Sequence, residues 1–257
     1  MSGPDLSGTK EAVGLPNDVR ACLFDLDGVL TDTARVHAAA WKEMFDAFLR
    51  GRAEREGAAF VPFDDDDYRR DIDGRRRPDG VRTFLASRGI VLPEGSQNDA
   101  SELETVGGLG NRKNELVLAL IQRNGVEAFE GSVRFVHAAR AEGLRCAVVS
   151  ASANCREVLE AAGIADLFEA RVDGIVAEQE GLRGKPAPDM YAAGAARLGV
   201  RPAEASVFED ALAGVEAGRA GGFGVVVGVD RVGRADALRD HGADIVVADL
   251  ADLLEPA

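Results

Sequence analysis

The sequence predicts an α/β fold, a doubly wound parallel sheet with a small helical domain inserted after the first strand. Two observations predict the sheet: short apolar runs typical of buried strands recur along the chain, and helical stretches separate them. A third predicts the insertion, because this alternation stops near residue 34 and resumes near residue 131. The 257 residues are 46% hydrophobic and 29% charged, which is typical of globular proteins and excludes a disordered, collagenous or coiled-coil chain.

The first strand is expected at residues 21–27, a mostly apolar run bounded by Gly28. Four later runs have the same character and are expected to complete the sheet: residues 144–150, 205–208, 223–229 and 244–247. The helices expected between them end near glycines that suit left-handed caps, and they cover residues 132–142, 156–162, 190–198 and 212–220. This order of elements indicates parallel pairing.

The chain is expected to divide into a sheet domain, residues 1–33 with 129–257, and a helical domain, residues 34–128. In the second, apolar residues recur at helical spacing after residue 36, and residues 115–123 form another amphipathic pattern. Between them lie four consecutive aspartates, residues 64–67. They fit either a metal site or a solvated acidic turn, and we favour the turn because short charge runs usually face water.

Acidic residues outnumber basic ones by 44 to 30, which gives a net charge of −14. So acidic a surface repels phosphate backbones and anionic lipid, and we expect neither nucleic acid nor membrane as a partner. Cys22, Cys146 and Cys155 cannot complete a disulfide framework and are expected to be reduced core residues. Because the first 18 residues are polar and no long apolar run occurs, we expect a cytoplasmic protein.

Two acidic pairs stand where predicted strands end. Asp25 and Asp27 close the first strand, and Glu209 and Asp210 close the strand at residues 205–208. Side chains two apart on a strand share a face, and open α/β sheets bind ligands at the carboxyl ends of their strands. Neighbouring carboxylates are costly to ionise without a cation or a shared proton. The pairs therefore need a cation or a shared proton nearby, with a turn or helix-cap pair as the alternative for Asp25 and Asp27.

Two other segments supply hydroxyls and positive charge. Residues 150–154, Ser-Ala-Ser-Ala-Asn, follow a predicted strand and precede a helix, which fits either an anion site or an ordinary N-cap. Lys185 lies in a loop that Pro186 and Pro188 restrict, and alone it would be a surface charge. Together with the acidic pairs, these residues place Asp-Asp, Ser, Lys and Glu-Asp on successive elements of one α/β core.

In this order the four groups resemble the motifs of the haloacid dehalogenase superfamily of phosphotransferases: Asp25-Leu26-Asp27-Gly28-Val29, Ser150, Lys185 and Glu209-Asp210. The resemblance covers nearly the whole chain and implies a Rossmann-like core. Within the superfamily the chain resembles the β-phosphoglucomutase subfamily, on residues 25–41, 110–114, 150–154, 184–189 and 208–215. The helical insertion resembles the cap domain of that subfamily.

The resemblance implies a mechanism through an aspartyl-phosphate. Asp25 would be the nucleophile and Asp27 the general acid and base. Lys185 would neutralise the nucleophile and the phosphoryl group, whose oxygens Ser150 and the Ala151 backbone would hold. The implied cofactor is Mg²⁺, and its ligands would come from Asp25, the backbone carbonyl of Asp27, Glu209 and Asp210.

The resemblance also implies that the cap binds the substrate. Arg77, in the loop Gly-Arg-Arg-Arg-Pro-Asp at residues 74–79, resembles an arginine that grips a second phosphate, with a solvated arginine patch as the alternative. The other implied contacts in the cap are His37, which also fits a buried helix histidine, Trp41 and Lys113. In the core, Ser152 and Asn154 are implied contacts as well. Two departures concern the substrate: Gly80 replaces a usual serine, and extra residues occur around 51–66 and 94–108.

Three functions fit these residues. We favour a β-phosphoglucomutase, which moves phosphate between carbons 1 and 6 of β-glucose through a bisphosphate. A sugar-phosphate phosphatase would use the same residues and admit water to the aspartyl-phosphate. A non-enzymatic phospho-acceptor shares the acids and the lysine but has no use for a cap, and a dehalogenase would not need Asp27. We expect a small sugar phosphate as the partner, and a monomer.

Overall fold

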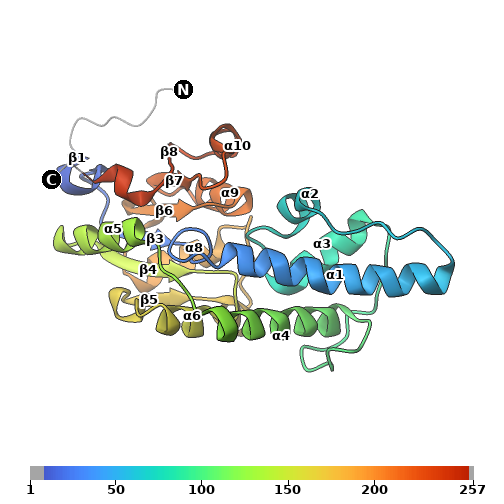
Figure 1. Ribbon diagram of the computed structural model, residues 1–257. Helices are drawn as coiled ribbons and strands as arrows, with labels where there is room; N and C mark the ends of the chain where they lie inside the picture. The colour runs from blue at the N-terminus through green and yellow to red at the C-terminus, as the bar shows by residue number, and fades with distance from the viewer. Residues whose placement is uncertain (1–8, 255–257) are drawn as a thin grey trace. The chain divides into compact units, whose positions relative to one another are not determined.

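A six-stranded parallel sheet is the centre of the first of two units in this computed structural model, which describes residues 9–254 (Figure 1). The sheet unit comprises the chain up to Asp32 and from Val126 onward, and the helical unit comprises Thr33–Gly125. Residues 1–8, the first part of the polar leader, lie outside the described residues, as do residues 255–257. None of the described helices is long and apolar enough to cross a membrane.

The strands of the sheet lie in the order β5-β4-β3-β6-β7-β8, and all neighbours are parallel. Their bounds are β3 Ala21–Phe24, β4 Arg145–Val149, β5 Ala170–Val172, β6 Ala205–Glu209, β7 Val225–Val229 and β8 Ile245–Val247. The chain runs outward from β3 to β5, then returns to β6 beside β3 and runs outward the other way. This confirms the doubly wound prediction and places the carboxyl end of β3 between those of β4 and β6.

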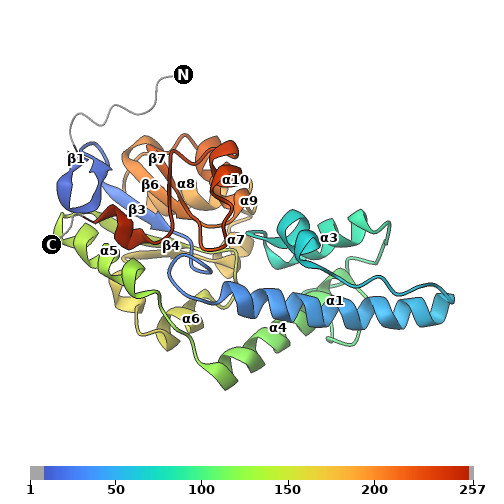
Figure 2. The ribbon, with the colours of Figure 1, turned by 45° about the horizontal axis from the view of Figure 1, so that its top comes forward.

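Helices cover both faces of the sheet (Figure 2). On one face, Leu23 and Val207 pack against α8 and α9. On the other, the rings of Phe24 and Phe208 stack with centroids 4.6 Å apart, and Phe135 of α5 lies edge-on to Phe24. Burial on both faces explains the continuous apolar runs of the strands. The helices of this unit are α5 Glu130–Ala141, α6 Cys155–Ala161, α7 Gly174–Gln179, α8 Asp189–Arg197, α9 Leu212–Ala220 and α10 Ala235–Asp240.

The elements that the sequence did not predict are short. β5 has three residues at the edge of the sheet, and α7 and α10 have six residues each. Inside the predicted polar leader, β1 Thr9–Lys10 pairs antiparallel with β2 Leu15–Pro16, around a short 3₁₀ turn. Val13 and Leu15 are fully buried there. Segments of this length hold too few residues to show a period of 2 or 3.6.

The three cysteines are buried free thiols, as predicted for core residues. Cys22 of β3 and Cys146 of β4 are register partners in the sheet. Burial raises the pKa of Cys146 to about 12, and it also raises the pKa of Cys22 and Cys155. The thiols therefore stay protonated at neutral pH and act as small apolar side chains.

Two long helices form the frame of the helical unit, α1 Ala34–Glu56 and α4 Val106–Asn124. Trp41 and Phe45 stack within α1, and Phe45 contacts Phe84 of α3 at a centroid distance of 4.1 Å. This confirms the helical spacing predicted after residue 36. α4 begins well before residue 115. The sequence did not predict this early start because the glycine-rich first turns of the helix hide the apolar pattern. The shorter elements are α2 Asp65–Asp67, the π-helix η2 Tyr68–Ile72 and α3 Arg77–Ser87.

The run of four aspartates begins a helix. The Asp64 carboxylate accepts the Asp67 N–H (2.9 Å), and the Asp67 carboxylate accepts the Asp64 N–H (3.2 Å), which is a capping box. Asp65 and Asp66 are exposed, as expected for a solvated turn. That interpretation is wrong for Asp67, which is buried.

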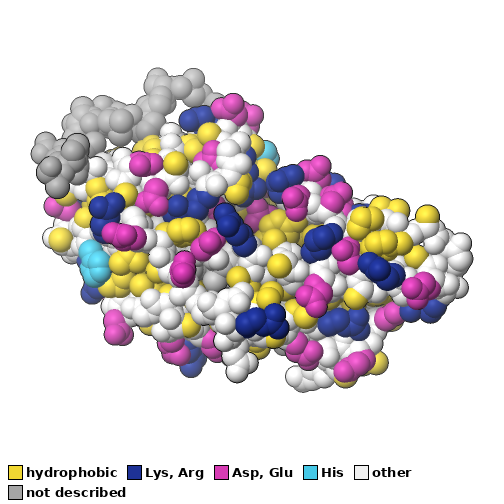
Figure 3. Space-filling view, viewed as in Figure 1, with side chains coloured by type: hydrophobic (Ala, Val, Ile, Leu, Met, Phe, Trp, Pro, Cys, Tyr) yellow, Lys and Arg dark blue, Asp and Glu magenta, His cyan; other side chains and the backbone are white. Residues whose placement is uncertain are grey.

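Over the face drawn in Figure 3, acidic and basic side chains are interspersed.

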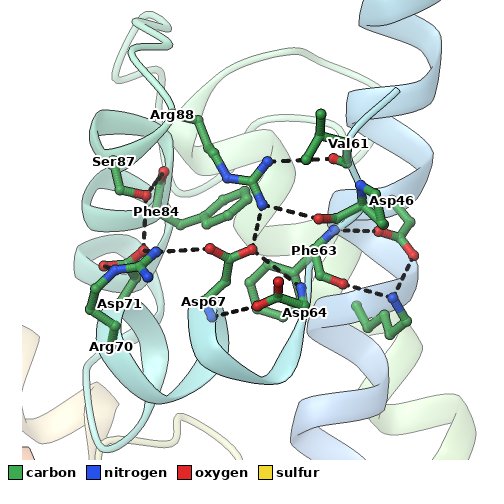
Figure 4. A network of polar contacts seen from close by, with 12 residues as sticks. Asp46, Val61, Phe63, Asp64, Asp67, Arg70, Asp71, Phe84, Ser87 and Arg88 are labelled. Carbon is green, nitrogen blue, oxygen red and sulfur yellow. Dashed lines mark hydrogen bonds and ion pairs between the residues drawn. The ribbon is translucent and has the colours of Figure 1, made fainter. Parts of the chain in front are cut away.

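Two arginines hold Asp67 (Figure 4). Arg88 and Arg70 both donate to its carboxylate, the latter at 2.8 Å. Arg70 also pairs with Asp71 (2.8 Å), which accepts the Ser87 hydroxyl (2.9 Å). Burial raises the pKa of Asp67, but the two guanidinium groups outweigh this effect and hold the pKa below its usual range. The network ties α2, η2 and α3 together.

Replacing Asp67 should destabilise the helical unit in a pH-dependent way. Asp67→Asn loses charge-assisted hydrogen bonds, so we expect the free energy of unfolding to fall by about 1.5–3 kcal/mol at neutral pH. Because the folded pKa is depressed, the wild-type advantage is complete above the unfolded pKa and is lost as the pH falls through the folded pKa. Urea unfolding followed by the fluorescence of Trp41, the one tryptophan, measures both effects.

The matched control is Asp66→Asn. The Asp66 side chain is 80% exposed and pairs with Arg69, which is 50% exposed, so we expect a change below about 0.5 kcal/mol. Equal losses of unfolding free energy in Asp67→Asn and Asp66→Asn would contradict the special role of the buried Asp67 carboxylate. So would an Asp67→Asn loss that stays unchanged in acid.

Candidate active site

Asp25 and Asp27 emerge from the carboxyl end of β3. The Asp25 N–H donates to the Phe208 carbonyl of β6 (2.9 Å), so the sheet still holds this residue. Its side chain is largely buried, whereas Asp27 is half-buried. Gly28 then turns the chain with a φ of 92°, and a Cβ there would lie 2.1 Å from Asp210 Oδ2. Only glycine allows this close approach of the two acidic loops.

The second acidic pair meets the first at this edge of the sheet. Glu209 is the last residue of β6 and is fully buried, and Asp210 follows it and is half-buried. Carboxylate oxygens of Asp25, Glu209 and Asp210 all lie within 4.8 Å of one another. The structure therefore brings together three of the four acids that the sequence placed at two separate strand ends, and the Asp27 carboxylate is not part of this cluster.

Lys185 lies between the two acidic pairs. Its side chain is fully buried and donates to Asp25 Oδ1 (2.5 Å), to Glu209 Oε1 (2.5 Å) and to the Val149 carbonyl (3.1 Å). Burial lowers the pKa of Lys185, but the two carboxylates outweigh this and raise it above its usual value. The group is therefore an ammonium at neutral pH. A surface position, as an isolated lysine would have, is excluded.

Tyr191 completes the surroundings of Glu209, and the sequence did not indicate this role. Its hydroxyl donates to Glu209 Oε1 (3.0 Å), and its ring lies 4.9 Å from Lys185 Nζ. Burial and the nearby carboxylates raise the pKa of Tyr191, so the hydroxyl keeps its proton. Glu209 Oε2 accepts the Ala211 N–H (3.0 Å). Three donors thus engage Glu209, whose closest partner is Lys185. The one signal in the sequence is a tyrosine followed by a run of small residues, Ala192–Ala196, in α8.

The charges of the cluster fit a divalent cation. Three carboxylates face one ammonium, and burial raises the pKa of Asp25 although Lys185 opposes the effect. Ionising all three acids leaves two negative charges that a second cation would balance. The donors are all carboxylate oxygens, which suit a hard ion such as Mg²⁺. Among residues 9–254, no other group of His, Cys, Asp and Glu side chains has this geometry.

The Ser150–Asn154 turn follows β4, the neighbour of β3. The Ser150 N–H donates to the Val172 carbonyl of β5 (3.0 Å), and the Ser150 hydroxyl, which is buried, accepts the Ser152 N–H (3.1 Å). The Ser152 hydroxyl accepts the Asn154 N–H (3.2 Å). The side chain of Asn154, the residue before α6, makes no capping hydrogen bond to this helix, so the ordinary N-cap interpretation is wrong. The hydroxyls instead shape a turn at the carboxyl end of β4, the strand that pairs with β3, and Ala151 and Ser152 are half-buried in it.

The four predicted residues of the insertion lie in the helical unit. Lys113 of α4 is buried, with its Nζ 3.1 Å from His37 Nδ1 and 5.0 Å from the centre of the Trp41 ring. Trp41 is a core residue stacked within α1. Arg77, at the start of α3, packs over Gly110 of α4. A Cβ on Gly110 would lie 3.5 Å from Cγ and Nε of Arg77. Gly110 and Lys113 are three residues apart, which places them on one face of α4.

The chain is similar to known proteins in sequence and in fold. The family model described as haloacid dehalogenase-like hydrolase matches residues 19–222. A Mycobacterium bovis protein named beta-phosphoglucomutase is 56% identical over 246 residues, which cover 94% of each chain. A Bacillus subtilis protein of the same name is 32% identical over 236 residues, or 91% of this chain and 92% of that one. A Clostridium difficile beta-phosphoglucomutase structure matches with a TM-score of 0.70 at 25% identity, covering 92% of this chain and 94% of that one.

Removing the buried ammonium should destabilise the sheet unit. Lys185→Met leaves Asp25 and Glu209 buried without their counter-charge, and we expect a loss of about 3–5 kcal/mol in the free energy of unfolding. Adding Glu209→Gln removes one of the carboxylates and should restore part of the loss. Urea unfolding followed by circular dichroism in EDTA measures both variants.

The matched control is Arg183→Met in the same loop. The Arg183 side chain is 75% exposed and pairs with Asp189, so its loss should cost less than about 1 kcal/mol. A Lys185→Met variant as stable as this control would contradict the buried charge balance.

Proposed function

We propose a function from the premise that this chain belongs to the haloacid dehalogenase-like hydrolase family. The chain is a Mg²⁺-dependent β-phosphoglucomutase, which transfers the phosphoryl group of a sugar phosphate through a phosphorylated Asp25. The reaction converts β-glucose 1-phosphate to glucose 6-phosphate. The observation that carries the proposal is the meeting of Asp25, Lys185 and Asp210 at one edge of the sheet. The chain's 56% identity to a protein named beta-phosphoglucomutase supports the choice of substrate.

Asp25 is placed to attack phosphorus. A carboxylate about 4 Å from a phosphate charge is repelled by about 4 kcal/mol at an effective dielectric near 20. Lys185 offsets this repulsion, because its ammonium lies 2.5 Å from Asp25 Oδ1. The same contact fixes the orientation of the carboxylate, and attack then proceeds from Oδ2 to form the aspartyl-phosphate.

Asp27 is the proposed general acid and base. It lies two residues beyond the nucleophile and is half-buried, so it reaches solvent more easily than Asp25 does. It would give a proton to the leaving sugar oxygen and take one from the hydroxyl that later attacks the phosphorus of the aspartyl-phosphate, which frees the Asp25 carboxylate. Ser150, Ala151, Ser152 and Asn154 form the turn that would hold the phosphoryl oxygens.

The acidic cluster is the proposed Mg²⁺ site. Asp25 and Asp210 would supply carboxylate ligands and Asp27 a backbone carbonyl, and Glu209 would contribute as the acid that also holds Lys185. When bound, the ion supplies positive charge that stabilises the transferring phosphoryl group.

The helical unit is proposed to grip the second phosphate. A bisphosphate intermediate must exchange its two ends at Asp25, so the distal phosphate needs a separate binding group. Arg77 suits it because a planar guanidinium binds phosphate bidentately. His37, Trp41 and Lys113 would contact the sugar, since they cluster on the elements next to Arg77 in this unit. A phosphatase needs no such grip, and a non-enzymatic acceptor needs no substrate contacts.

The test supplies β-glucose 1-phosphate with trace β-glucose 1,6-bisphosphate and Mg²⁺, and follows glucose 6-phosphate and free phosphate together. A mutase forms glucose 6-phosphate as the main product and stops when EDTA removes the metal. Free phosphate as the main product would instead establish the phosphatase.

Two variants extend the same assay to the second phosphate. Arg77→Ala loses a charge-assisted contact, so we expect isomerisation to slow by about 10- to 150-fold and free phosphate per turnover to rise. Arg75→Ala, two residues away in the same arginine cluster, is the matched control and should stay within about twofold of wild type. Isomerisation at the wild-type rate in Arg77→Ala would remove Arg77 from the substrate site.

A further inference from the structure

Two arginines of the loop after β7 bond the backbone of both acidic loops. Arg231 Nε donates to the Gly28 carbonyl (2.8 Å), and Arg234 Nη2 donates to the Asp210 carbonyl (2.7 Å). Gly28 directly follows Asp27, and Asp210 is itself one of the clustered acids. Neither arginine belongs to the motifs that identified the site. This loop, residues 230–234, therefore contacts the backbone at both acidic pairs.

Arg231 is fixed on several sides. Its side chain is 19% exposed, and its guanidinium carbon lies 3.5 Å from the centre of the Phe129 ring. Nη1 pairs with Asp249 Oδ2 (2.9 Å), and Nη2 donates to the Ser132 hydroxyl (3.2 Å). The planar guanidinium of Arg231 can contact all these partners in only one orientation. The Gly28 carbonyl is therefore bound to a rigid group.

Ser132 extends the same contact to the next residue. Its hydroxyl is buried and donates to the Val29 carbonyl (2.6 Å). Arg231 and Ser132 therefore bind two consecutive carbonyls, those of Gly28 and Val29, immediately after the acids of β3. These bonds fix the path of the chain just where Gly28 passes close to the Asp210 carboxylate.

The loop that carries the arginines is itself a closed turn. The Asp230 carboxylate accepts the N–H groups of Val232 (3.2 Å), Gly233 (2.7 Å) and Arg234 (2.8 Å). The Asp230 N–H in turn donates to the Val247 carbonyl of β8 (2.7 Å). These hydrogen bonds make the turn rigid and fix the backbone positions of Arg231 and Arg234 relative to each other.

We propose that Arg231 and Arg234 are positioning residues that set the separation between the Asp25–Asp27 loop and Asp210. The inference rests on the proposed function, because that separation matters for the Mg²⁺ site and for attack by Asp25. The arginines bond backbone oxygens and not substrate. Their loss therefore weakens Mg²⁺ binding and slows turnover, while substrate affinity, which other residues provide, stays the same.

The experiment uses Arg231→Met and Arg234→Met in the full chain. Isothermal titration with Mg²⁺ alone should show about 10-fold weaker binding in each variant, and kcat for β-glucose 1-phosphate should fall about 10-fold with KM within about twofold. Arg239→Met is the matched control on α10. The Arg239 side chain is 54% exposed and pairs with Asp236, which is 97% exposed, so all three values should stay within about twofold.

Unchanged Mg²⁺ affinity and unchanged kcat in folded Arg231→Met and Arg234→Met, with only a lower melting temperature, would overturn the proposal. Should Arg231→Met fail to fold, Arg234→Met decides, because it removes an independent contact. Arg231→Lys keeps the charge without the planar fork and should restore stability more fully than kcat. Should the wild type bind Mg²⁺ but isomerise no sugar phosphate, the proposed function fails and the Mg²⁺ titration still decides the positioning role.

Discussion

The ammonium of Lys185 lies fully buried between two carboxylates that come from different strands, Asp25 after β3 and Glu209 at the end of β6. Burial of any one of these charges alone would be costly, so the three groups are stable only together. This requirement fixes β3 and β6 as neighbours and brings Asp210 to the same edge. Tyr191 and the Ala211 N–H supply further donors to Glu209 and hold it in place.

The two units have separate cores and separate parts in the proposed reaction. The sheet unit holds the groups that transfer the phosphoryl group, and the helical unit holds the groups proposed to select the sugar phosphate. Gly80 lies in the helical unit, where a Cβ would lie 3.3 Å from Ile72 and 3.5 Å from Trp41. Glycine in place of the family's usual serine thus accompanies tight packing around Trp41.

The sequence predicted those features that depend on local patterns. Apolar strands buried on both faces and acids at strand ends are such features, and the parallel sheet and the meeting of Asp25 with Asp210 followed from them. Features that depend on distant partners were not predicted. Arg231 reaches Gly28 across 203 residues, and Asp67 is buried because Arg88, 21 residues later, pairs with it. No window of sequence shows such contacts.

The central claim is that phosphate passes through Asp25 and back to the sugar. The most direct measurement incubates the protein with β-glucose 1,6-bisphosphate labelled in its phosphates, maps the label to a peptide, and then adds unlabelled glucose 6-phosphate. We expect an acyl-phosphate on the Asp25 peptide, absent in Asp25→Asn, and return of the label to the bisphosphate. Label on another residue, or label that appears only as free phosphate after the chase, would contradict it.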